Sequence, residues 1–475
     1  MIIITCILAY FCVLMAIGRW VSRKNGNDTF FRGERRSPWY MVAFGMVGAS
    51  ISGVTFVSVP GMVLSSGMTY LQLCMGFILG YLVVAFVLLP IYYQLNTASI
   101  YGYLQQRLGR RSHQTGTWFF LLSKMAAAAL KFYVVCIILQ RFVFNELGLP
   151  LYITVLLLVL LIWLYTQRGG IRTLVFTDVF QTLCLFSALL LIIYKVVDAH
   201  YDGIGEALQA VLTDEHSRIF VTNDWASPQN LWKQLVSGLF IVVVMTGLDQ
   251  DMMQKNLTCK TLHEAQKDMC SYGVAFLPAN FLFLALGVLL TQLFALQQTA
   301  LPAKGDELLP MFVEQQGGLV AILFVIGIVA ASFSSADSAL TSMTTCYCVD
   351  IRQQAGNERL RRYTHLTMCG VFALFILICD AVNSKSLIDA IYTMVSYTYG
   401  PLLGLFAFGL FTRKQPNDQW VPAVCIAAPL LCFAADSIAK QQFDYHFGYE
   451  LLLLNGLITF AGLWLSAKDQ QPATK

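Results

Sequence analysis

Apolar segments of about 20 residues, the length that crosses a bilayer, follow one another along almost the whole chain. Of the 475 residues, 57% are hydrophobic and only 12% are charged, whereas soluble domains average roughly 45–50% and about 25%. A soluble chain with so few charges would expose a large apolar surface to water, but a bilayer solvates such a surface. The composition therefore predicts an all-α polytopic membrane protein whose main partner is the lipid bilayer.

We expect about thirteen transmembrane helices, because each span needs about 20 apolar residues. They are predicted at residues 1–20, 38–63, 69–94, 117–144, 149–167, 171–198, 230–250, 269–296, 310–349, 362–384, 386–412, 420–438 and 447–466. Most of the 31 Lys and Arg residues fall on the side that holds the C-terminal tail, and basic residues accumulate on cytoplasmic loops. We therefore expect an outside N-terminus and a cytoplasmic C-terminus in a plasma membrane, with a bacterial inner membrane as the expected location.

The same residues argue against several other classes of protein. The net charge of +4 gives no indication of nucleic-acid binding, and the 13 Cys residues form no C-x-x-C pair. The six His residues lie in loops or near helix ends, so neither a Ser–His nucleophile nor a metal cluster can be assembled from them. We expect no enzyme, and keep an intramembrane enzyme and a sodium channel as remote alternatives; the oligomeric state is not readable.

A run rich in glycine and hydroxyl residues, from Gly45 to Gly61, occupies the middle of the second predicted helix. Gly and Pro weaken the helical hydrogen-bond ladder, and free carbonyls are tolerated at membrane depth only where they line a cavity or bind something. The run therefore favours a broken helix over its alternative, close packing of helices through small residues.

The ninth predicted helix carries a stripe of hydroxyl groups. Ala331, Ser334, Ser335 and Ser338 follow the i, i+3, i+4, i+7 spacing of one helix face. A single Ser often bonds back to a preceding carbonyl, but a whole stripe of hard oxygen atoms favours the binding of a hard cation.

Two carboxylates, Asp178 and Asp337, lie within predicted spans. An acid at the bilayer centre costs about 2.5–3.5 kcal/mol or more, so it indicates a functional site by default. For Asp178 the alternative is an interfacial acid paired with Arg168 or Arg172.

These blocks together resemble the sodium/solute symporter family, whose members carry sugars, sialic acid, proline, vitamins and iodide with sodium. The resemblance rests on the segments Thr29–Trp39, Thr55–Pro60, Gly169–Gln181, Gln250–Lys255, the serine stripe through Ile351, and Tyr399–Phe411. It implies a LeuT-like inverted repeat of five plus five helices, with a broken helix 2 and a broken helix 7. The implied division is a first peripheral helix and cytoplasmic loop (1–37), a first repeat (38–198), an extracellular loop (199–229), a second repeat (230–412), and two peripheral helices with a short tail (413–475).

The resemblance also implies the coupling ion and its ligands. The main sodium site would use the carbonyl groups of Gly48, Ile51 and Ala331 and the hydroxyl groups of Ser334 and Ser335. A second cation, which some members hold, would meet Asp178, Ser334, Asp337 and Ser338. Asp337 departs from the members that hold two sodium ions, in which this position matches a serine. The second cation is therefore either a second sodium, which we favour, or a proton shared by two nearby acids.

The solute is the part of the function that the sequence defines least. Polar residues expected around a central cavity are Ser50, Ser52, Thr55, Gln72, Cys74, Lys131, Thr246, Asp249, Gln250, Tyr397 and Tyr399. They suit a sugar or sugar derivative, including a sugar acid such as sialic acid, but also an amino acid, a nucleoside or a vitamin. The helix 4 arginine that binds the carboxylate in sialic acid transporters aligns with Ala127, whereas Lys131, one turn later, either receives an anionic solute or neutralises Asp178 or Asp337.

Overall fold

The computed structural model describes residues 2–21, 26–145, 147–225, 227–382, 387–443, 445, 447–448 and 450–467. Within these ranges the chain is helical apart from its connections, and its β-structure is a single isolated bridge between Ser37 and Cys259. The all-α fold class is therefore confirmed. The tail beyond residue 467 lies outside the described residues.

Eight helices among the described residues are long and apolar enough to cross a membrane. They are α1 (Ile2–Val21), the continuous stretch of α5 and α6 (Tyr70–Leu95), α8 with the turn after it (Arg110–Phe144), the second half of α9 (Gly169–His200), α13 (Leu262–Leu296), α15 with the turn after it (Gly318–Ile351), α16 (Glu358–Val382) and α19 (Val421–Phe443). Shorter apolar helices are Leu151–Gln167 in the first half of α9, α18 (Gly400–Phe411) and α20 (Leu451–Ser466). The number of spans, the division into two repeats and the side that each terminus faces stay predictions.

Two further apolar helices are broken, as predicted for helices 2 and 7. In helix 2, α3 (Trp39–Ser50) and α4 (Gly53–Ser66) are bent by 62° at the break. In helix 7, the stretch Leu231–Gly247, which begins with α11 (Leu231–Val242), meets α12 (Gln250–Asn256) at 70°. The Asp249 carboxylate accepts a hydrogen bond from the Asp251 N–H at 2.8 Å and so starts α12. The predicted end of this helix at residue 250 is therefore wrong, because the second half continues to Asn256.

Gly170 joins the two halves of α9 (Leu151–His200), which the sequence predicts as separate helices. Its φ of +51° and ψ of −138° are not helical, and only glycine adopts such a backbone without strain. A Cβ at this position would also lie 2.5 Å from the ring of Phe30. The chain therefore turns here close against α2 (Asn27–Arg32).

The remaining helices are short. They are α7 (Gly102–Arg107), α10 (Ile204–Thr213), α14 (Leu308–Gln316) and α17 (Leu387–Thr398). The connection 199–229 was expected to be a loop, but α10 forms within it because Leu208, Val211 and Leu212 share one face with Ala207.

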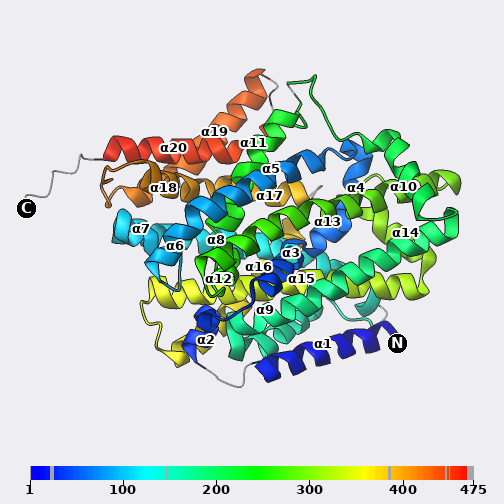
Figure 1. Cartoon of the computed structure of the whole chain (residues 1–475), viewed down its shortest axis with the longest axis horizontal. Helices are drawn as coiled ribbons and strands as arrows, with labels where there is room; N and C mark the ends of the chain where they lie inside the picture. The colour runs from blue at the N-terminus through cyan, green and yellow to red at the C-terminus, as the bar shows by residue number, and fades with distance from the viewer. Residues whose placement is uncertain are drawn as a thin grey trace, which may run out of the picture.

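Helix α15 lies at the centre of the packing. It contacts both halves of α9, α8 and the two halves of broken helix 2, and most of its residues are buried. In contrast, α1 and α20 lie on opposite sides of the molecule (Figure 1). The polar stripe of α15 is therefore enclosed by protein on several sides, where hydroxyl groups are tolerated inside a membrane.

Candidate functional site

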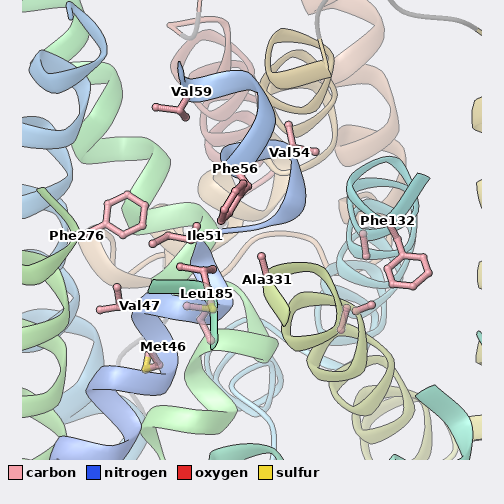
Figure 2. Packing of buried hydrophobic residues seen from close by; sticks show 14 of the residues in the cluster. Met46, Val47, Ile51, Val54, Phe56, Val59, Phe132, Leu185, Phe276 and Ala331 are labelled. Carbon is pink, nitrogen blue, oxygen red and sulfur yellow. The ribbon is translucent and has the colours of Figure 1, made fainter. Parts of the chain in front are cut away.

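The break in helix 2 leaves backbone oxygen atoms available. Ile51 and Ser52 lie between the two helical halves, and within the described residues neither Gly48 nor Ile51 offers its carbonyl oxygen to a backbone N–H. Figure 2 shows the chain passing through Ile51 between α3 and α4, with Ala331 on the neighbouring α15. Free carbonyl oxygens at membrane depth are typical ligands of a sodium ion.

The serine stripe meets this break directly. The Ser335 hydroxyl donates to the Ala49 carbonyl at 2.7 Å and to the Ala331 carbonyl at 3.2 Å. One hydroxyl oxygen of α15 is therefore in contact with the unwound part of helix 2. The predicted main sodium ligands come from these two facing segments: Gly48 and Ile51 from helix 2, and Ala331, Ser334 and Ser335 from α15. This set of neutral oxygen atoms fits a sodium ion.

Small residues allow the close approach of the helices around this site. A Cβ on Gly48 would lie 1.9 Å from the Thr182 Oγ1 of α9, and a Cβ on Gly53 would lie 2.2 Å from the Ser332 Oγ. Because no side chain fits at either position, the glycines of the run serve packing as well as the break. Both interpretations of the run in the sequence are therefore correct.

A buried polar cluster adjoins the main site. Ser334 donates to the Asp178 Oδ1 at 2.6 Å, and the Lys255 Nζ lies 2.8 Å from the Asp178 Oδ2. Asp178, Ser334 and Lys255 are each only 1% exposed. Among the described side chains, Asp178 therefore pairs with Lys255, whereas Arg172 pairs with Glu34 at 2.8 Å. The side chain of Arg168 lies outside the described residues, so its pairing with Asp178 stays a prediction.

Asp337 belongs to the same cluster. Its Oδ2 accepts a hydrogen bond from the Tyr165 hydroxyl at 2.6 Å, and its Oδ1 accepts one from Ser338 at 3.3 Å. The side chain is fully buried. The four residues predicted for the second cation therefore lie in one cluster, while their role stays a prediction.

A cavity of about 1040 Å³, including its part open to solvent, lies beside the helix 2 break. The predicted solute-binding residues that line it are Ser50, Ser52, Thr55, Lys131, Thr246, Asp249 and Tyr399. Ala49 and Ser335 also line it. The cavity therefore shares residues with the candidate sodium site, so that a bound solute and a bound ion would be close neighbours.

Four other predicted solute-binding residues lie outside the cavity lining. Gln72 donates to the Gln229 carbonyl at 2.9 Å and accepts from the Val221 N–H at 3.1 Å. Gln250 donates to the Ala98 carbonyl at 2.8 Å and accepts from the Ile100 N–H at 2.9 Å. Cys74 is buried, and the Tyr397 hydroxyl bonds Asp436 at 3.4 Å. The amide groups of Gln72 and Gln250 therefore bond the backbone of connections. Solute binding by all four residues stays a prediction.

The charges in the cavity are arranged unevenly. Lys124 pairs with Asp249 at 2.9 Å and with Asp251 at 2.7 Å, and the Tyr399 hydroxyl donates to Asp249 at 2.9 Å. Lys131 lines the same cavity but has no ion pair or hydrogen bond among the described residues. Lys124 therefore has two ion-pair partners, whereas the ammonium of Lys131 makes no direct ion pair among the described residues.

The comparison with known proteins agrees with this geometry. The sequence model of the sodium:solute symporter family matches residues 30–419. This chain belongs to that family. As a sodium-coupled symporter of a small polar solute it is an integral membrane protein, and sodium is its coupling ion, as the resemblance predicted.

Curated relatives of this symporter cover almost its whole length. The sodium/sialic acid symporter NanT of Aliivibrio fischeri is 27% identical over 95% of this chain and 92% of its own. The sodium/sialic acid symporter SiaT of Proteus mirabilis is 25% identical over 98% and 95%. The sodium/glucose cotransporter of Vibrio parahaemolyticus is 24% identical over 98% and 90%.

Solved structures confirm the fold of the symporter. The substrate-bound outward-open state of a Na⁺-coupled sialic acid symporter aligns with a TM-score of 0.82 at 21% identity, covering 99% of both chains. The nucleobase-cation-symport-1 transporter Mhp1 aligns with a TM-score of 0.59 at 15% identity, covering 93% of this chain and 94% of its own.

Several residues of the candidate sites were not predicted from the sequence. Asp251 completes the ion pair with Lys124, and Lys255 pairs with Asp178. Tyr272 also lines the cavity, where its hydroxyl lies 2.5 Å from the Ser50 hydroxyl beside the helix break and accepts from Tyr81 at 2.8 Å. The alternation Asp249-Gln-Asp251 was a usable signal for the first, but no local pattern marks Tyr272.

Proposed function

We propose that this symporter imports a small hydroxylated solute with an anionic group, a sugar acid, and that Lys131 receives the anion. The supporting observation is the pairing of charges in the cavity: Lys124 is held by two carboxylates, while Lys131 has no such partner among the described residues. A buried ammonium without a direct ion pair is costly within the membrane, and a solute carboxylate in contact with Lys131 would form that pair. The sialic acid specificity of NanT and SiaT, a sugar acid in each case, supports the same class.

The remaining cavity residues suit the rest of such a solute. Hydroxyl groups of Ser50, Thr55 and Thr246 line the cavity together with charged groups, and each can donate and accept a hydrogen bond. The hydroxyl groups of a polyol can form hydrogen bonds with these side chains both as donors and as acceptors. Sugars without a carboxylate, amino acids, nucleosides and vitamins remain the alternatives.

Sodium would bind where the broken helix 2 meets the serine stripe, at Gly48, Ile51, Ala331, Ser334 and Ser335. An ion there links α3 and α4 to α15, and favours the conformation in which these segments are together. Because Ala49 and Ser335 belong to both the sodium region and the cavity lining, ion binding also shapes the solute site. This provides the coupling free energy between the two ligands. The sodium gradient across the membrane supplies the free energy for solute accumulation.

The test is uptake into proteoliposomes. Labelled sialic acid, gluconate, glucuronate, glucose and proline are compared with an inward sodium gradient and with sodium replaced by choline. We expect sodium-dependent, saturable uptake of one of the three acids and little of glucose or proline. Uptake of a neutral sugar in preference to every acid would contradict the assignment of the anion.

Lys131→Met tests the residue itself. We expect the half-saturating concentration of the acid to rise at least tenfold, corresponding to the loss of about 1.4 kcal/mol or more, and Lys131→Arg to retain most of the affinity. Lys195→Met is the matched control, since Lys195 is exposed and lies at a different pocket. An unchanged affinity in Lys131→Met would remove Lys131 from the solute site.

A further inference from the structure

Lys255 is a buried cation placed where the sequence predicts a second sodium ion. Its ammonium lies 2.8 Å from the Asp178 Oδ2, and both side chains are no more than 2% exposed. The residue lies on α12, the second half of broken helix 7, whereas Asp178 lies on α9. A cation of the protein itself therefore reaches the acid of the predicted second site from a different helix.

Both oxygen atoms of Asp178 are engaged in this arrangement. Oδ2 faces the ammonium of Lys255, and Oδ1 accepts the hydroxyl proton of Ser334 at 2.6 Å. A sodium ion bound to Asp178 would lie about as close to the ammonium as the carboxylate does. Two like charges this close in a buried environment repel each other, because little solvent screens them.

Asp337 also interacts with the ammonium of Lys255. Its two oxygen atoms accept hydrogen bonds from Tyr165 and Ser338, and Lys255 interacts with it electrostatically as well as with Asp178. Both acids of the cluster therefore share a counter-ion that the chain supplies.

We propose that Lys255 acts as the built-in cation of the second site, so that the symporter binds one sodium ion, at the main site, per transport cycle. The proposal rests on the main sodium site proposed above. It assigns to Lys255 the part that a second sodium would otherwise play. It also explains why an acid at residue 337 is compatible with a buried cluster, because the added negative charge interacts with a positive one.

The test counts bound sodium ions and needs no solute. Equilibrium binding of ²²Na⁺ to the purified full-length protein is measured with choline as the background cation. We expect one sodium ion per chain for the unmodified protein and two for Lys255→Met, in which the acids have lost their cation. The double variant Lys255→Met with Asp178→Asn removes one acid together with the cation, and we expect it to bind one.

The unmodified protein decides the proposal even where Lys255→Met fails to fold. Two sodium ions bound per unmodified chain would overturn it, and so would a folded Lys255→Met protein that still binds only one. Lys440→Met is the control, because Lys440 is a half-exposed lysine paired with Asp436 away from the cluster. No sodium binding by the unmodified protein would instead refute the main sodium site itself, so the two failures are distinguishable.

Discussion

Replacing Gly48 with Ala should weaken sodium binding more than it disturbs the rest of the fold. The added Cβ would lie 1.9 Å from the Thr182 Oγ1, 2.7 Å from its Cβ and 2.9 Å from its Cγ2. Thr182 cannot simply rotate away, because its hydroxyl donates to the Asp178 carbonyl at 2.6 Å. The helices α3 and α9 must therefore separate, and the Gly48 carbonyl moves away from Ser335.

The magnitude follows from the cost of overpacking. An extra methyl group in a closely packed interior costs about 1–3 kcal/mol, which corresponds to about 5–150-fold in an equilibrium constant. If the sodium-bound conformation carries this cost, the sodium concentration that half-saturates ²²Na⁺ binding should rise by that factor. The assay is equilibrium ²²Na⁺ binding to the purified protein, with melting temperature measured in choline as a separate readout of folding.

Two further variants separate packing from other effects. Gly370→Ala adds the same methyl group to a transmembrane helix where nothing lies within 4 Å, so it should leave sodium affinity unchanged. Adding Thr182→Ala to Gly48→Ala removes two of the three crowded atoms and should restore part of the affinity. A wild-type sodium affinity in Gly48→Ala would refute the placement of the ion between α3 and α15.

Three other substitutions test the packing and the charges away from the ion. Lys124→Met leaves two neighbouring carboxylates of the cavity without their cation, so we expect a loss of about 3–5 kcal/mol in the free energy of unfolding, measured by denaturation in detergent; a loss under 1 kcal/mol would contradict the pairing. Gly170→Ala forces a side chain onto a positive φ and against Phe30, so the melting temperature should fall, and an unchanged value would argue against this turn. Although burial raises the pKa of Asp214, hydrogen bonds from Gln292 and His216 outweigh it and hold that pKa below the ordinary value. The stability contributed by Asp214 is therefore present above about pH 4 and is lost below it, and Asp214→Asn should flatten this acid limb of the stability curve.

The sequence predicts the fold well because the bilayer imposes a simple rule. Every backbone polar group must be satisfied inside a span, so apolar length alone places the helices, and a run such as Gly45–Gly61 marks where one breaks. The serine stripe is equally visible, since it needs only the helical period from Ala331 to Ser338. These features are local in the chain, and the structure confirms the broken helices and the facing of the stripe toward the break.

The charged partners are not predictable in the same way. Lys255 interrupts the apolar pattern, so hydropathy assigns it to the loop after the seventh predicted helix (230–250) rather than to the membrane interior. It is buried only because Asp249 restarts the helix and α12 carries the lysine back to Asp178. Partners that are distant in sequence and brought together by a bend leave no local pattern. For the same reason Tyr272 was missed, whereas Gln72 and Gln250, which are polar and lie in the expected segments, turned out to bond loop backbone.

A single sodium ion and a monoanionic solute together make a specific electrical prediction. The pair carries no net charge, so the membrane potential, which contributes about 2.3 kcal/mol per charge per 100 mV, would add nothing to steady accumulation. A tenfold sodium gradient supplies about 1.4 kcal/mol and would support about tenfold accumulation whatever the potential. With two sodium ions one positive charge would enter per cycle, and an inside-negative potential of 100 mV would raise accumulation about 50-fold. Imposing such a potential with valinomycin and potassium on proteoliposomes therefore separates the two cases, since accumulation that responds strongly to the potential is incompatible with one sodium ion and a singly charged acid.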